Sequence, residues 1–132
     1  MTKPLVSIIT PCYNGEAFLK RYFESILNQT YPNLELIFIN DGSTDRTEEI
    51  ALSYRERLEK RGITYIYEKQ ENAGQAAALN RGLKLFTGEY LTWPDSDDEM
   101  VSDAVEKKVD YLEQHPDYGF CICKTKVVNE NN

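Results

Sequence analysis

The chain of 132 residues carries a formal net charge of −7, and 41% of its residues are hydrophobic. This length suits one domain with a sizeable core, and the hydrophobic content excludes an intrinsically disordered protein. The acidic balance and the lack of a basic cluster argue against nucleic acid as a partner, because phosphates repel a negative surface. No apolar run is long enough to cross a bilayer and the N-terminus lacks the apolar core of a signal peptide, so the sequence predicts a cytoplasmic protein.

Short runs rich in β-branched and aromatic residues alternate with helical patterns along the whole chain. In chain order, the predicted strands are residues 5–10, 34–39, 63–67, 89–93 and 118–124. A helix is expected in each interval, the last at residues 102–114. The second strand is apolar nearly throughout, as expected of a strand that is covered on both faces. The order βαβαβαβαβ predicts an α/β sandwich with a mainly parallel sheet.

Local signals mark where the predicted helices begin and end. Asp45 with Glu48 resembles a capping box at the start of the second helix, and Gly62 is a natural C-terminal stop for it. The segment 72–74, Asn-Ala-Gly, forms a turn into the third helix, which Gly88 ends. These signals support helices that each connect one strand to the next.

Polar clusters follow three of the predicted strands, at residues 11–16, 40–45 and 95–99. Because right-handed crossovers place the C-terminal ends of parallel strands along one edge, the three clusters should meet there. Ligands bind at this edge in open α/β sheets. The sequence therefore predicts one functional site built from all three clusters.

The segment Asp95-Ser96-Asp97-Asp98 places three carboxylates within four residues. It is either an acidic loop or helix start, since carboxylates favour helix N-termini, or a site for a hard divalent cation. An EF-hand loop is not supported, because Met100 stands at the offset from Asp95 where the loop requires glycine. A carboxylate pair at a strand end leaves coordination positions open, which suits a metal–diphosphate complex better.

Asp41 and Tyr13 are candidates for contact with a nucleobase. Asp41 follows the buried second strand, where its carboxylate can accept a hydrogen bond from a ring N–H, as uracil offers. Turn chemistry explains Gly42 fully and is the competing explanation for the Asp-Gly pair. Tyr13 either stacks on a base, a contact worth roughly 1–3 kcal/mol, or packs against the protein.

Several common kinds of site are absent from the sequence. It contains neither GxGxxG nor GxxxxGK[ST], so dinucleotide binding and P-loop hydrolysis are not supported. His115 is the single histidine and precedes Pro116 at a predicted helix end, so it is expected at a helix terminus rather than in a catalytic triad. The cysteines form no zinc-binding pair, and Cys121 and Cys123 are expected to share one face of the last strand as small buried hydrophobic residues.

Taken together, these segments resemble the family 2 glycosyltransferases, which have the GT-A fold. The motifs that carry the resemblance are, in order, VSIITPCYN (6–14), SILNQTYP (25–32), ELIFINDGSTD (35–45), NAG with ALN (72–74 and 78–80), and GEYL with DSDD (88–91 and 95–98). The resemblance covers nearly the whole chain. It implies a Rossmann-like α/β/α sandwich in which residues 1–132 form a single family 2-like domain. It also implies transfer of a sugar from a nucleoside diphosphate, with a UDP-sugar favoured, to a hydroxyl of a glycan or lipid-linked acceptor, with inversion.

The resemblance also assigns roles by position. The residues that would bind the nucleotide sugar are Pro11, Tyr13, Asn14, Glu16, Asp41, Gly74, Asp95 and Asp98. Asp97, together with Asp95, would hold Mn²⁺ or Mg²⁺ in a DxD motif, and the metal would stabilise charge on the leaving diphosphate as a Lewis acid. Leu79 departs from the family pattern, because many relatives have arginine there. The positive charge is therefore either missing or supplied by Arg81 or Lys69.

The family places its general base in a segment after the fifth strand. That base is therefore expected beyond Asn132, and the chain is expected to be the donor-binding half of a truncated protein. The resemblance leaves open peripheral association of the longer protein with the inner face of a membrane, and polysaccharide, lipopolysaccharide or glycoprotein assembly as the pathway. One alternative is a non-catalytic nucleotide- or metal-binding module. A flavodoxin-like receiver domain would need its acidic pair after the first strand, where residues 11–13 are Pro-Cys-Tyr.

Overall fold

The chain folds around one parallel sheet in a computed structural model that describes residues 2–129. The strands are β1 (Val6–Cys12), β2 (Leu34–Asp41), β3 (Thr64–Gln70) and β4 (Tyr90–Thr92), in the order β3-β2-β1-β4. β1 pairs with β2 up to Cys12 opposite Asn40, and β2 pairs with β3 up to Asp41 opposite Gln70. This register aligns the C-terminal ends of the three long strands at one edge, as the sequence predicts.

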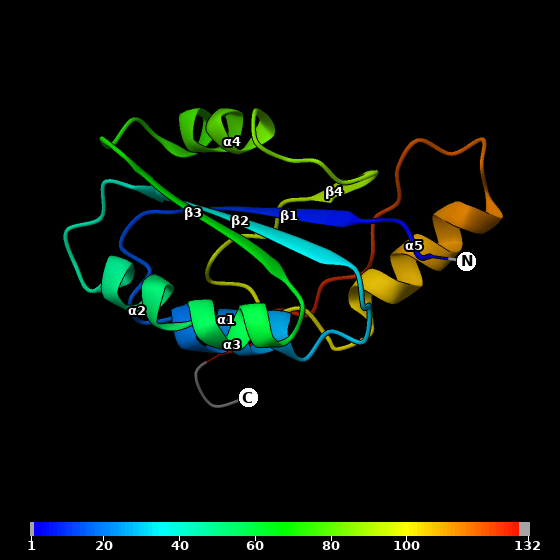
Figure 1. Cartoon of the computed structure of the whole chain (residues 1–132), viewed down its shortest axis with the longest axis horizontal. Coiled ribbons are helices and arrows are strands. Elements are labelled where there is room, and N and C mark those ends of the chain that lie inside the picture. Colours follow the sequence, from blue (N-terminus) through cyan, green and yellow to red (C-terminus); the bar gives the residue numbers. More distant parts are fainter. Residues whose placement is uncertain (1, 130–132) are drawn as a thin grey trace.

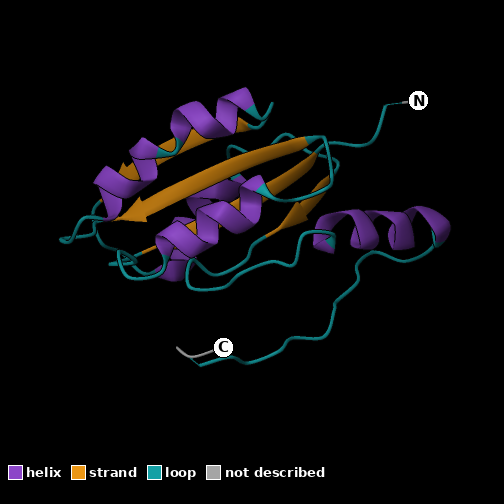
Figure 2. Cartoon of the chain, turned by 90° about the horizontal axis from the view of Figure 1, so that it is seen from below, coloured by secondary structure: helices purple, strands orange, loops and turns teal. Residues whose placement is uncertain are grey.

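The part of the chain between residues 2 and 129 contains five helices. They are α1 (Leu19–Leu27), α2 (Thr47–Ser53), α3 (Arg55–Lys60), α4 (Gln75–Leu83) and α5 (Ala104–Gln114). Figure 1 shows α4 on one face of the sheet and α1, α2 and α3 on the other. In Figure 2, α5 lies beyond the N-terminal ends of the strands, away from the edge where the strands finish. None of the helices within residues 2–129 has the length and apolar character needed to span a membrane.

Alternating side chains of β1 and β2 feed two apolar cores, one on each face of the sheet. On one face, Ile8 and Phe38 belong to a large core, in which Phe38 stacks on Phe23 of α1 with ring centroids 5.5 Å apart. On the other face, Ile9 packs in a smaller core with Ala78 of α4. Every residue of β2 is buried, so the prediction of a strand covered on both faces is confirmed.

The predicted fifth strand at residues 118–124 is wrong. This segment and the rest of the chain up to residue 129 have no regular secondary structure, and Phe120 and Ile122 are 79% and 87% exposed. Alternating apolar residues form a strand only where a sheet edge pairs with them, and this segment pairs with no strand of the described chain. The expectation for the two neighbouring cysteines fails with it, because Cys121 is only partly buried and Cys123 is exposed.

The helical region after β2 also differs from the prediction. It is divided at Tyr54 into α2 and α3, and Gly62 ends it with a φ of +86°, as expected of a left-handed C-terminal residue. The capping box does not form, because α2 begins at Thr47 and Asp45 therefore lies before the N-cap position. The Asp45 carboxylate still accepts the Thr47 N–H at 3.0 Å, whereas Glu48 turns away from it.

Candidate functional site

A cleft of about 370 Å³ lies where β1, β2 and β4 lead into their loops. The residues that line it are Pro11, Cys12, Tyr13, Asn14, Gly15, Phe18, Asp41, Gln75, Asp95, Ser96 and Asp97. They come from all three polar clusters that follow the strands, together with Phe18 before α1 and the first residue of α4. The structure thus brings Asp41 and Asp97 to one cleft, although they are far apart in the sequence.

The acidic cluster at one side of this cleft has the donor atoms for a divalent cation. One carboxylate oxygen from each of Asp95, Asp97 and Asp98 lies within 4.8 Å of the others, and all three residues are exposed. Partial desolvation of the Asp98 carboxylate raises its pKa, and the charges of Asp97 and Asp95 raise it further. Mg²⁺ and Mn²⁺ favour carboxylate oxygens and would relieve this repulsion, so the residues fit such an ion.

Gln75 supports one member of this cluster. Its side-chain amide donates a hydrogen bond to Oδ1 of Asp95 at 3.0 Å. Because this bond restricts rotation of the Asp95 carboxylate, it holds the second carboxylate oxygen in one orientation. Gln75 is the first residue of α4, so the contact ties the start of that helix to the loop after β4.

Asp41 anchors the turn between β3 and α4. Its side chain is almost fully buried, with 3% exposure, and accepts hydrogen bonds from the N–H groups of Ala73 at 2.9 Å and Gly74 at 3.0 Å. The side-chain amide of Gln70 donates a further bond at 2.8 Å. Burial alone would raise the pKa of Asp41, but these hydrogen bonds outweigh it and bring the pKa below its ordinary value.

Gly42 allows the turn to pack closely against the end of β2. Its φ is +71°, and a Cβ at this position would lie 2.6 Å from the backbone nitrogen of Asn72. Both the backbone conformation and the contact therefore require glycine. Gly74 also has a positive φ of +97°, but a Cβ at that position would meet no described atom within 4 Å. Gly74 is thus suited to the turn by its conformation rather than by close packing.

Comparisons with known proteins identify the family of the chain. Residues 7–132 match the family profile described as "Glycosyl transferase family 2". The chain belongs to this family. An uncharacterized glycosyltransferase of Haemophilus influenzae is 42% identical over 127 residues, which are 92% of this chain and 50% of that relative. The family 2 chain therefore spans half of this relative's length.

Solved structures show the same fold. TarS 1–349 of S. aureus in complex with UDP has a TM-score of 0.77 and 26% identity, covering 85% of the family 2 chain and 33% of TarS 1–349. The mannosyltransferase PcManGT of Pyrobaculum calidifontis, in complex with GDP-Man and Mn²⁺, has a TM-score of 0.75 and 29% identity, over 85% and 33% of the two chains. The fold of the family 2 chain is GT-A, as the sequence predicts.

The loops after β1 and β2 of this family 2 chain are tied to each other. Oδ1 of Asn14 accepts the Thr44 N–H at 2.8 Å, and Oε2 of Glu16 accepts the Arg46 N–H at 2.9 Å. In return, the Glu16 N–H donates to Asp45 at 3.1 Å. Asn14 lines the cleft, but Glu16 does not. In this structure Glu16 therefore joins the two loops, and its predicted contact with the nucleotide sugar stays a prediction.

No basic residue is among the described residues that line the cleft. Leu79 packs against the smaller core under α4, so the arginine of many relatives is replaced here by an apolar contact. Of the two suggested substitutes, Arg81 pairs with Glu68, and Lys69 pairs with Glu48 at 3.3 Å. Both cations are therefore engaged outside the cleft, which leaves it with only acidic charges.

The remaining predicted residues are placed as follows. Pro11 and Tyr13 line the cleft, and Tyr13 is 53% exposed, so its ring is available to a ligand. Gly74 and Asp98 do not line it, although Gly74 bonds to Asp41 and Asp98 belongs to the acidic cluster. His115 is the C-cap residue of α5, as predicted.

Sequence reasoning missed Phe18 and Gln75, which line the cleft but lie outside the three predicted clusters. Within the clusters, it gave no individual role to Cys12, Gly15 or Ser96. Burial raises the pKa of the Cys12 thiol, so the group stays neutral near pH 7 and serves packing. Gln75 could have been predicted from the sequence. In an open α/β sheet, the first residue of a helix that follows a strand faces the edge where ligands bind.

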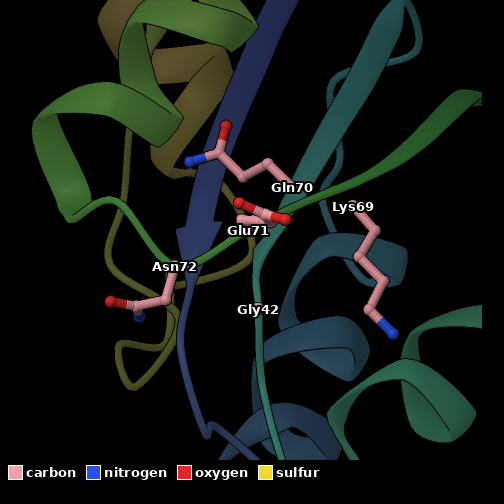
Figure 3. Close-up of a pocket in the computed structure, with 5 residues that line it drawn as sticks. All are labelled: Gly42, Lys69, Gln70, Glu71 and Asn72. Atoms are coloured by element: carbon pink, nitrogen blue, oxygen red, sulfur yellow. The ribbon is translucent and has the colours of Figure 1, made fainter.

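A second, open hollow of about 510 Å³ adjoins the turn that Asp41 anchors. Gly42, Lys69, Gln70, Glu71 and Asn72 line it. Figure 3 shows the side chains of Lys69 and Asn72 extending to opposite sides of β2, and Gly42 on the chain that follows β2. Gln70 thus borders this hollow and also donates a hydrogen bond to the carboxylate of Asp41.

Proposed function

We propose that this chain is the donor-binding domain of an inverting glycosyltransferase that uses a nucleoside-diphosphate sugar, most suitably a UDP-sugar, with a divalent cation. The observation that carries the proposal is the shared cleft of Asp41 and the acidic pair Asp95 and Asp97. The cleft offers the carboxylate of Asp41 to a base and the oxygens of Asp95 and Asp97 to a metal ion. Their arrangement suits a ligand that has a nucleobase at one end and a diphosphate at the other.

Each end has a defined task in this proposal. Tyr13 stacks on the base and Asp41 accepts its ring N–H. Among the relatives' ligands, UDP and GDP-Man both contain a base with a ring N–H, which favours this role of Asp41. Asp97, with Asp95 held by Gln75, binds Mn²⁺ or Mg²⁺. When bound, this ion would stabilise the negative charge of the departing diphosphate.

The acidic character of the cleft supports metal dependence. Three carboxylates, those of Asp41, Asp95 and Asp97, line it without a basic side chain among the described lining residues. A diphosphate approaching this surface alone meets repulsion, which a divalent cation removes. The acceptor hydroxyl of a glycan or lipid-linked substrate would attack from the open side, and the family resemblance places the general base after residue 132. A cytoplasmic location, where nucleotide sugars are available, completes the proposal.

Titration calorimetry of UDP with and without Mn²⁺ tests this function. The wild-type chain should bind UDP in the presence of Mn²⁺, and Asp97→Ala should lose most of this binding. Asp117→Ala is the matched control, because it removes another exposed carboxylate, one that lies outside the cleft. Absence of Mn²⁺-dependent UDP binding by a folded wild-type chain would reject the proposal. Binding without sugar transfer in the longer protein would instead indicate a non-catalytic nucleotide-binding module.

A further inference from the structure

The carboxylate of Asp41 has no free acceptor position. Each carboxylate oxygen accepts about two hydrogen bonds. Oδ1 already accepts from Gln70 at 2.8 Å and from the Ala73 N–H at 2.9 Å. Oδ2 accepts from the Gly74 N–H at 3.0 Å and from the side chain of Asn72 at 3.4 Å. A base that donates a ring N–H to Asp41 must therefore replace one of these donors.

The backbone donors are poorly suited to leave. The N–H groups of Ala73 and Gly74 belong to the turn that packs on Gly42, and the Gly74 carbonyl accepts the first hydrogen bond of α4, from Ala78 at 3.1 Å. Moving either N–H group would break this turn. The side chain of Asn72 is held separately, because it also donates to the backbone carbonyl of Asp41 at 3.1 Å.

Gln70 is the donor that can leave. It is the last residue of β3. Within the described residues, its side chain makes one hydrogen bond, to Asp41. It also borders the open hollow of about 510 Å³, which gives the side chain room to rotate without moving the backbone. Rotation of Gln70 would free one acceptor position on an otherwise buried carboxylate.

We infer that Gln70 occupies, in the nucleotide-free protein, the acceptor position on Asp41 that the ring N–H of the base takes on binding. This inference rests on the proposed function. Gln70 is then a specificity-determining residue, because a base with a ring N–H facing Asp41 replaces the lost hydrogen bond. Uracil and guanine carry such a donor, whereas the corresponding nitrogen of cytosine or adenine has a lone pair that faces the carboxylate unfavourably. An incoming base without the donor leaves a buried acceptor unpaired, which is disfavoured.

Gln70→Met tests the inference, because methionine has nearly the same length but no donor. We expect Gln70→Met to bind UDP about 3- to 10-fold more tightly than wild type at saturating Mn²⁺, since no hydrogen bond has to be exchanged. The diphosphate of 3-methyluridine lacks the N3–H and should show no such gain. Asn72→Leu removes the other side-chain donor and should not tighten UDP binding. Circular dichroism and thermal unfolding check that each variant is folded.

The outcomes separate the two proposals. UDP binding by wild type with equal or weaker binding by Gln70→Met overturns the inference and leaves the proposed function standing. A gain for Asn72→Leu in place of Gln70→Met assigns the exchangeable position to Asn72 and also overturns it. Tighter binding of the methylated nucleotide by Gln70→Met shows that the gain has nothing to do with the ring N–H. Failure of folded wild type to bind UDP rejects the proposed function and this inference together.

Discussion

Replacing Asp41 by asparagine should destabilise the protein strongly, although the two side chains have nearly the same size. The carboxylate is 3% exposed and receives the N–H groups of Ala73 and Gly74 on different oxygens. Asparagine has one acceptor oxygen and one NH₂ group, so one of these N–H groups must face another donor. Asp41→Asn therefore loses at least one charge-assisted hydrogen bond and leaves a backbone donor unpaired.

The expected loss in the free energy of unfolding is about 2–4 kcal/mol. A hydrogen bond to a charged group contributes about 1.5–3 kcal/mol, and an unpaired buried donor costs about 1–3 kcal/mol. These contributions overlap, and partial relaxation of the turn reduces their sum. The control is Asp97→Asn, which changes an exposed carboxylate of the acidic cluster. Surface changes of this kind usually lie within about 0.5 kcal/mol, and relief of repulsion in the cluster acts in the stabilising direction.

Urea unfolding monitored by circular dichroism, at several pH values, measures the free energy of unfolding of wild type and both variants. The folded-state pKa of Asp41 is lowered, so its contribution is present above the unfolded-state pKa of about 3.9 and is lost as the pH falls through the lower folded-state value. The difference between wild type and Asp41→Asn should thus be constant above about pH 5 and shrink below about pH 4. A loss below about 1 kcal/mol at pH 7, or one no larger than that of Asp97→Asn, would refute the anchoring role.

Two further predictions concern the backbone around the site and the opposite end of the sheet. Gly42→Ala should lower the free energy of unfolding in urea by at least about 1 kcal/mol more than Gly62→Ala does. Both glycines have a positive φ, but only a Cβ at Gly42 would lie 2.6 Å from the backbone of Asn72. Equal losses for the two variants would show that the turn moves to accommodate the Cβ. Glu35→Gln should cost about 1–3 kcal/mol, because the buried carboxylate accepts the Thr87 N–H at 3.0 Å and the Thr87 hydroxyl. A loss below about 0.5 kcal/mol for Glu35→Gln would mean that the amide satisfies the same donors.

The strands that build the site could be predicted because each is an apolar run closed by polar residues. The prediction stopped too early at three of them, since β1 continues to Cys12, β2 to Asp41 and β3 to Gln70. Polar residues at a strand end look like a loop in the sequence, but the paired backbone continues there, with Asp41 opposite Gln70. The strand prediction for residues 118–124 was wrong for the opposite reason. The composition of this segment favours a strand, but within the described chain it pairs with no other strand.

The meeting of the three polar clusters could also be predicted, because it depends only on topology. The contacts within the site could not. Asp41 is bonded to a turn about thirty residues further along the chain, at Asn72 and Gly74, and no local pattern encodes that pairing. The pairing of Lys69 with Glu48 similarly removes a cation that the sequence offers to the cleft. Such contacts depend on which loops the fold places side by side.

The distribution of charge in the cleft predicts that binding of the nucleotide and binding of the metal ion strengthen each other. The cleft presents Asp95 and Asp97 without a basic partner among its described lining residues. A phosphate about 4 Å from one carboxylate is repelled by about 1 kcal/mol in water, and by more where solvent is partly excluded. Two such pairs weaken UDP binding at least about tenfold in the absence of metal.

Mn²⁺ should therefore increase UDP affinity at least about tenfold, and UDP should increase Mn²⁺ affinity by the same factor, because coupling between two binding sites is reciprocal. Calorimetric titration of each ligand in the absence and presence of the other measures both factors. Asp97→Asn reduces the repulsion and also removes a metal ligand, so it should lower both factors together while binding of UDP alone improves. If UDP binds equally well in excess chelator, the carboxylates do not face the diphosphate, and the metal-dependent function proposed for the cleft is rejected.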